Sequence, residues 1–305
     1  MPVEIEFDPD VFHGELTANR AQVFVRAPRT ADLADCTLHG YVQGPRCEYA
    51  HTLPAKFTLQ DLGAGPTLLA RTTVTDPCLW TSDLPQIYDV HIELRRGTEV
   101  LAREQRLLGL RGIGARTGGE TPQLVREGKA WVPRGVALES LETIEVTALR
   151  EHLLVGVCTS PPLDLLVEAS RRGLYLIARL DHEKQDVPQA IRNLARWPAI
   201  MAASIRHGEA LDRSLTQVAP NLLLLQEIEV STWDPAPLAA WAAAVLVTLR
   251  PGESRLPSGG FVDSLPCLVQ RPSTVANLPP DQARAECDRL QRDLASARQF
   301  SGYLI

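Results

Sequence analysis

Residues 153–205 read LLVGVCTSPPLDLLVEASRRGLYLIARLDHEKQDVPQAIRNLARWPAIMAASI, and this stretch decides the fold class. It contains three short, nearly continuous apolar runs, at 153–159, 174–180 and 199–205, with helical stretches between them. A strand of a parallel sheet has this composition because both of its faces are covered. The alternation of such strands with helices predicts an α/β domain built on a parallel sheet.

The same alternation continues on both sides of this stretch. Eight apolar runs are found in all, which is the number of strands that closes a (β/α)8 barrel. The barrel would occupy residues 131–305, fewer than the roughly 200 residues of small barrels, so its helices must be short. The predicted strands cover residues 131–137, 153–159, 174–180, 199–205, 222–228, 244–249, 266–270 and 301–305, and the predicted helices 164–172, 188–197, 237–243 and 281–299.

The first 110 residues follow a different pattern. Apolar and polar residues alternate over short runs separated by turn residues, as in AQVFV at 21–25 and YDVHIEL at 88–94. This period of two, with spaced turns, indicates an antiparallel β-sandwich. We therefore predict a multidomain β plus α/β chain, with a sandwich at residues 1–113 and a compact TIM barrel at 114–305.

Composition and simple motifs exclude several classes of protein. The 305 residues are 45% hydrophobic and 22% charged, with a net charge of −6, which favours a globular protein and argues against nucleic-acid binding. No uninterrupted apolar run is long enough for a membrane span, and MPVEIEFDPD at 1–10 lacks the features of a secretory signal. The six cysteines form no CxxC pair. We expect a cytoplasmic protein with no membrane or nucleic-acid partner, and, without a GxGxxG or P-loop, no cofactor.

Three motifs around the junction of the two predicted domains point to a family. PCLWTSDLPQIY at 77–88 resembles the P-x-L-W-S-P-x-x-P-x-L-Y motif of glycoside hydrolase family two, the family of β-galactosidases and β-glucuronidases. GLRGI at 109–113 is similar to the family's G-F-R-x-I, and GKAWVPRGV at 128–136 to G-K-P-x-x-L-R-G-V in the first barrel strand. The resemblance implies an immunoglobulin-like sandwich followed by a TIM barrel, and an ancestry among O-glycosyl hydrolases.

The resemblance also implies where two catalytic glutamates should stand. A retaining glycosidase uses two carboxyl groups about 5 Å apart, one as nucleophile and one as acid and base. The family places the acid at the end of barrel strand four and the nucleophile at the end of strand seven. These positions hold Gly208 and Arg271, and no carboxylate occurs between Asp263 and Asp281. Glu209 is the candidate acid if strand four ends one residue later.

Other polar side chains of the family's site are replaced as well, so the resemblance implies a site that is degenerate. The positions of the family's strand-four Asn, its strand-two Arg and His, and its strand-one Asn are held by His207, Cys158, Pro161 and Ala137.

The remaining polar residues that follow predicted barrel strands are candidates for binding, because TIM-barrel active sites lie at the carboxyl ends of the strands. Asp181-His182-Glu183, with His207 and Glu209, has the residue types of a divalent metal site. A polar rim around a barrel mouth is the simpler interpretation, and we predict no metal. Alternation places Glu227 and Glu229 on one side of their strand. The candidate binding residues are Asp181, His207, Glu227 and Arg271.

Three hypotheses about function follow. The preferred one is a family-two-like protein that is catalytically inactive and binds carbohydrate or a protein partner. The second is an active O-glycosyl hydrolase rebuilt around Glu209 with Asp181, Glu227 or Glu229. The third is a structural partner in an assembly.

Overall fold

Contacts within the chain divide this computed structural model into two compact units. The first comprises residues 1–111 with 196–198, and the second 112–195 with 199–305. The predicted domain boundary between residues 113 and 114 stays a prediction, because a division into compact units does not show that each unit is an independent domain. The structure describes residues 7–118, 121–138, 145–206, 211–229, 238–253, 264–275, 278–296 and 298–305.

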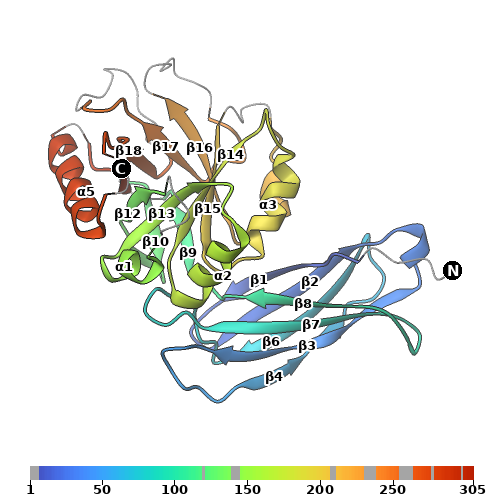
Figure 1. Cartoon of the computed structure of the whole chain (residues 1–305). Coiled ribbons are helices and arrows are strands. Elements are labelled where there is room, and N and C mark those ends of the chain that lie inside the picture. Colours follow the sequence, from blue (N-terminus) through green and yellow to red (C-terminus); the bar gives the residue numbers. More distant parts are fainter. Residues whose placement is uncertain are drawn as a thin grey trace. The chain divides into compact units, whose positions relative to one another are not determined.

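The first unit consists of two four-stranded antiparallel sheets with one hydrophobic core (Figure 1). Their strand orders are β1-β2-β6-β5 and β4-β3-β7-β8. Alternate residues of β2, such as Val23 and Val25, are buried and share the core with Leu38 and Val42 of β3. This confirms the antiparallel sheets that the alternation of apolar and polar residues predicted. The elements are β1 (Asp10–Leu16), β2 (Arg20–Pro28), the 3-10 helix η1 (Ala31–Leu33), β3 (Cys36–Arg46), β4 (Ala55–Thr58), β5 (Gln60–Asp61), β6 (Thr67–Thr75), β7 (Ile87–Arg96) and β8 (Glu99–Leu108).

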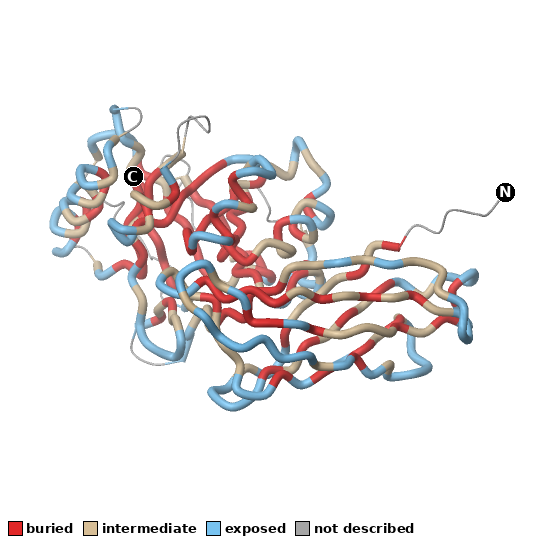
Figure 2. Tube along the Cα trace, turned by 60° about the horizontal axis from the view of Figure 1, so that its bottom comes forward, coloured by how far each residue is buried: buried red, intermediate tan, exposed pale blue. Residues whose placement is uncertain are grey.

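The second unit contains a closed barrel of eight parallel strands, in the order of the sequence from β12 to β19 (Figure 1). Gly135 pairs with Leu304, so the last strand lies beside the first and closes the barrel. The strands are buried along nearly their whole length, as their continuous apolar composition predicts (Figure 2). All eight predicted strands are present: β12 (Arg134–Ala137), β13 (Leu154–Thr159), β14 (Leu176–Asp181), β15 (Ile200–Arg206), β16 (Leu223–Glu229), β17 (Ala244–Thr248), β18 (Cys267–Gln270) and β19 (Gly302–Leu304).

Among the described residues of the second unit, α1 to α4 have ten residues or fewer and α5 has 15. The predicted helix at 237–243 does not form in its described part. Residues 238–243 make a turn instead, with the Ala239 N–H donating to Gln226 Oε1 at 2.9 Å. Helical propensity contributes little over so few residues, and tertiary contacts such as this hydrogen bond decide the local structure. The helices in the described residues are α1 (Val146–Glu151), α2 (Leu163–Arg172), α3 (Val187–Ala195), α4 (Leu215–Val218) and α5 (Pro280–Leu294).

A small antiparallel sheet precedes the barrel strands within the second unit, and the sequence did not predict it. Its order is β11-β10-β9, formed by β9 (Ile113–Arg116), β10 (Gln123–Arg126) and β11 (Lys129–Ala130). Strands of two to four residues are too short to show a period of two, which explains the omission.

The structure bears on two features considered in the sequence, disulfide bonds between the cysteines and helices that could span a membrane. All six cysteines are free thiols, as the lack of a regular cysteine pattern indicates. Burial raises the pKa of Cys158, Cys267 and Cys287 to about 12, so these thiols stay protonated at neutral pH. Within the described part of the chain, no helix combines the length and the apolar character that crossing a bilayer requires.

His13 on β1 is a buried histidine in the first unit, with 8% of its surface exposed. Burial, and secondarily the positive charge of Arg111, lower the pKa of His13 from 6.5 to about 4. Its imidazole is therefore neutral in the folded protein at pH 7.

The folded state should therefore lose stability as the pH falls from 6.5 towards 4. Over this range the unfolded chain takes up a proton at His13 and the folded chain does not, so the free energy of unfolding falls by up to about 3 kcal/mol. Urea denaturation at several pH values should show this loss in the wild type and in the exposed control His51→Gln. His13→Leu should lack it, and an unchanged pH dependence in His13→Leu would contradict the assignment.

Candidate functional site

Polar side chains meet inside the barrel at the carboxyl ends of its strands. Arg179 on β14 donates from Nη2 to Oε1 of Gln270 on β18. Three strands separate β14 from β18 in either direction around the barrel, so the two residues stand on opposite walls. Both side chains must point inward for this bond to form. Arg179 therefore bridges the interior at the end where active sites of this architecture lie.

The same guanidinium approaches a buried carboxylate on β16. Arg179 Nη2 lies 3.5 Å from Glu227 Oε1, and the Glu227 side chain is only 2% exposed. The Ser204 hydroxyl on β15 donates to Glu227 Oε2 at 3.4 Å. Arg206 Nη2 lies 3.3 Å from Glu227 Oε1. Two guanidinium groups and one hydroxyl thus satisfy a carboxylate that would otherwise be costly to bury.

Arg206 continues the network towards solvent. Its Nη2 lies 3.2 Å from Glu229 Oε1, and the Arg206 and Glu229 side chains are 42% and 39% exposed. Because the same nitrogen lies 3.3 Å from Glu227 Oε1, the two carboxylate oxygens are at most about 6.5 Å apart. We call the connected residues the mouth cluster: Arg179, Ser204, Arg206, Glu227, Glu229 and Gln270.

The strand register explains why these residues meet. Arg179 pairs with Ser204, and Arg206 pairs with Glu227 on the next strand. Directly paired residues of neighbouring strands point to the same side, and residues two apart on one strand do so as well. Polar residues at these positions of apolar strands are thereby gathered at one end of the barrel interior.

Asp181, a predicted binding residue, lies at the end of β14 and on the rim. It forms an ion pair with Lys184 Nζ at 2.9 Å and accepts a hydrogen bond from the Glu183 N–H at 3.2 Å. The hydrogen bond from Lys184 is the main cause that lowers the pKa of Asp181. The neighbouring His182 Nδ1 lies 3.2 Å from the Arg206 carbonyl oxygen. The Asp181 carboxylate is therefore ionised and close to the mouth cluster.

Arg271, at the position that the resemblance gives to the nucleophile, lies outside the mouth cluster. Its Nη1 donates to Asp293 Oδ2 on α5 at 2.8 Å and to the Glu253 carbonyl oxygen at 3.4 Å. The residue at the end of β18 that enters the barrel is Gln270. Neither Gln270 nor Arg271 carries a carboxylate.

Some of the remaining predicted positions fall among the described residues and others do not. His207, Gly208 and Glu209 lie outside the described residues, so Glu209 as an acid stays a prediction. Cys158, in the place of the family's Arg, is buried and holds a protonated thiol. In the portion of the chain that the structure describes, no group of three or more His, Cys, Asp or Glu is arranged to hold a metal ion.

Sequence reasoning did not single out Arg179 or Ser204. Their signal was nevertheless present, because each interrupts an otherwise apolar strand, as Arg179 does in LYLIARL at 174–180. A charged or polar residue in a buried strand requires a partner. Several polar residues within apolar strands, all near strand ends, would have predicted a polar network. They would not have predicted which of these residues bind one another.

Solved structures with a similar fold are family-two glycoside hydrolases. The chain is similar to a β-glucuronidase from Bacteroides uniformis, with a TM-score of 0.61 and 13% identity, covering 96% of this chain and 44% of that one. A family 2 glycosyl hydrolase from Bacteroides cellulosilyticus gives 0.60 and 15%, covering 98% and 43%. A β-glucuronidase from Lactobacillus rhamnosus gives 0.60 and 12%, covering 97% and 60%.

These similarities establish the fold and leave the activity open. The chain spans about half the length of the structures it matches. No protein-family model and no curated protein matches its sequence. The chain therefore has the fold of glycoside hydrolase family two, as the motifs indicated, and its function has to be inferred from its own residues.

The mouth cluster should be important for stability, because Glu227 is the common partner of two arginines. Glu227→Leu leaves Arg179 and Arg206 without this counter-charge and should lower the free energy of unfolding by about 3 kcal/mol. Glu168→Leu removes an exposed i,i+4 pair with Arg172 and should cost less than about 1 kcal/mol. Urea denaturation of both variants tests this, and equal stabilities would show that the buried network contributes nothing.

Proposed function

We propose that this protein is a catalytically inactive relative of family-two glycoside hydrolases that binds carbohydrate at the mouth of its barrel. In this proposal the first unit is an immunoglobulin-like sandwich and the second a reduced (β/α)8 barrel. The observation that carries the proposal is Gln270, which enters the barrel at the end of β18 and binds Arg179. An amide cannot form the glycosyl ester of a retaining mechanism.

The environment of Glu227 also argues against hydrolysis. Its carboxylate is 2% exposed and lies against Ser204, Arg179 and Arg206. A nucleophile or general acid must reach the glycosidic bond, and Glu227 would have to leave these partners to do so. These contacts support a structural role for the Glu227 carboxylate.

The outer part of the mouth cluster offers groups suited to a sugar. Arg206 and Glu229 are partly exposed, and Asp181 is 28% exposed on the rim beside them. Together they present donors and acceptors, and each sugar hydroxyl both donates and accepts hydrogen bonds. The structural neighbours named β-glucuronidases support a carbohydrate as the ligand class.

One observation bears on a rival function. The carboxylates of Glu227 and Glu229 lie near one another, because both contact Arg206 Nη2, at 3.3 and 3.2 Å. A glycosidase needs two carboxyl groups beside its substrate. The rival is a hydrolase rebuilt around Glu209, with Asp181, Glu227 or Glu229 as its second carboxyl group.

Hydrolysis assays separate the two functions. We expect the wild type to release no p-nitrophenol from p-nitrophenyl β-glucuronide, β-galactoside or β-glucoside above the rate without protein, because no free carboxylate stands at the end of β18. Turnover by the wild type that is lost in Glu209→Gln or Glu229→Gln would establish the rival function. Retention of turnover in both variants would point to a contaminating enzyme.

Binding should depend on the exposed arginine of the mouth cluster. On a glycan array, Arg206→Ala should bind its preferred glycan at least about tenfold more weakly than the wild type, because a charged hydrogen bond is lost. Arg213→Ala, which alters an exposed arginine of the same unit, should bind as the wild type does. Absence of glycan binding, together with a stable protein that co-purifies, would favour a role as a structural partner in an assembly.

A further inference from the structure

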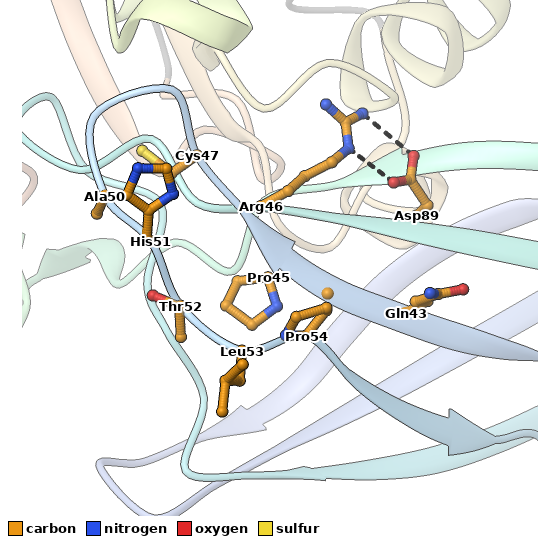
Figure 3. Close-up of a pocket in the computed structure, with 11 residues that line it drawn as sticks. Gln43, Pro45, Arg46, Cys47, Ala50, His51, Thr52, Leu53, Pro54 and Asp89 are labelled. Carbon is orange, nitrogen blue, oxygen red and sulfur yellow. Dashed lines mark hydrogen bonds and ion pairs between the residues drawn. The ribbon is translucent and has the colours of Figure 1, made fainter.

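A pocket opens in the first unit, far along the chain from the residues of the mouth cluster. It lies between the end of β3, the start of β7 and the loop 47–54, and its volume is about 500 Å³ (Figure 3). Pockets that bind small molecules have volumes from about 300 to 1,000 Å³. The space is therefore large enough for a small ligand. It is lined by Gln43, Gly44, Pro45, Arg46, Cys47, Ala50, His51, Thr52, Leu53, Pro54 and Asp89.

The charged groups of this pocket neutralise each other. Arg46 donates to Asp89 through Nε at 2.7 Å and through Nη2 at 3.2 Å, as the two dashed lines in Figure 3 show. Gln105 Nε2 also donates to Asp89 Oδ1 at 3.2 Å. Burial alone would raise the pKa of Asp89, but the hydrogen bond and charge of Arg46 lower it overall. The pocket thus holds a fixed, ionised pair with no net charge.

The rest of the lining combines apolar surfaces with polar groups, and it includes the imidazole of His51 and the thiol of Cys47. Pro45, Pro54 and Leu53 lie along one side in Figure 3, and Leu53 is 93% exposed. Gln43 and Thr52 add an amide and a hydroxyl, which can donate and accept hydrogen bonds. A single exposed leucine is ordinary on a protein surface, but together with the two prolines it gives the pocket an apolar side next to these polar groups.

We propose that this pocket binds a neutral mono- or disaccharide. A sugar ring has apolar C–H faces, which fit Leu53 and the two prolines, and hydroxyls at its edges, which fit Gln43, Thr52 and the Arg46–Asp89 pair. The pair offers donors and acceptors in fixed positions, which coupled hydroxyl groups can use. A charged ligand would gain no net attraction here, because the guanidinium and the carboxylate already offset each other. This site goes beyond the function proposed for the barrel and does not depend on it.

Saturation-transfer NMR with the full chain tests the proposal, using glucose, galactose, maltose, cellobiose, lactose and N,N′-diacetylchitobiose as probes. At least one neutral sugar should give a signal in the wild type. Gln43→Ala and Leu53→Ser, which alter exposed residues, should each weaken its binding about tenfold. Gln60→Ala, an exposed glutamine elsewhere in the unit, should leave the affinity unchanged.

Two further comparisons make the test specific to this pocket. Arg206→Ala removes any contribution of the barrel to sugar binding, and in this background Gln43→Ala should still weaken the remaining binding about tenfold. Asp89→Asn should make the pocket cationic and raise the affinity for glucuronic acid relative to glucose. The proposal is overturned if no neutral sugar binds, or if Gln43→Ala and Leu53→Ser bind as tightly as the wild type. It is also overturned if glucuronic acid binds the wild-type pocket more tightly than glucose does.

Discussion

The guanidinium of Arg179 spans the interior of the barrel, and the character of the site depends on this interaction. It connects β14 with Gln270 on the opposite wall and with Glu227 on β16. The Arg179 side chain is 24% exposed, and both partners come from the strand ends at which active sites of this architecture lie. The same interaction therefore provides a counter-charge for the buried carboxylate of Glu227 and joins opposite walls of the barrel.

The surroundings of the Glu227 carboxylate differ from those of a catalytic carboxyl group. In a retaining glycosidase a carboxyl group faces the substrate and attacks it or donates a proton to it. In this barrel the described partners of the carboxylate are two arginines and a serine, and Arg206 and Glu229 extend the network to solvent. The fold is shared with family-two glycoside hydrolases, whereas the contacts of this carboxylate belong to this chain, so fold and activity must be argued separately.

The sequence was sufficient to predict the antiparallel sheets and the eight barrel strands, but not the small sheet β9–β11 or the contacts of the site. Eight apolar runs predicted eight barrel strands, because burial on both faces requires continuous hydrophobicity. The prediction of a helix at 237–243 was wrong for its described part. Helix propensity depends on local sequence and does not include the hydrogen bond from the Ala239 N–H to the Gln226 side chain. The contact between Arg179 and Gln270 joins residues 91 positions apart and depends on barrel closure, which no local pattern contains. The absence of a carboxylate at the end of strand seven could be predicted from the order of residues alone. The strand ends at Gln270 and is followed by Arg271, and neither side chain is a carboxylate.

The central claim is that no carboxylate of the barrel mouth acts as a nucleophile. Its most direct test is the mass of the intact protein after incubation with activated 2-deoxy-2-fluoro β-glycosides, which trap the glycosyl-enzyme of a retaining enzyme. We predict that the mass stays unchanged for the glucosyl, galactosyl and glucuronyl reagents. An added sugar that maps to Glu209, Glu227 or Glu229 would contradict the account and identify the nucleophile.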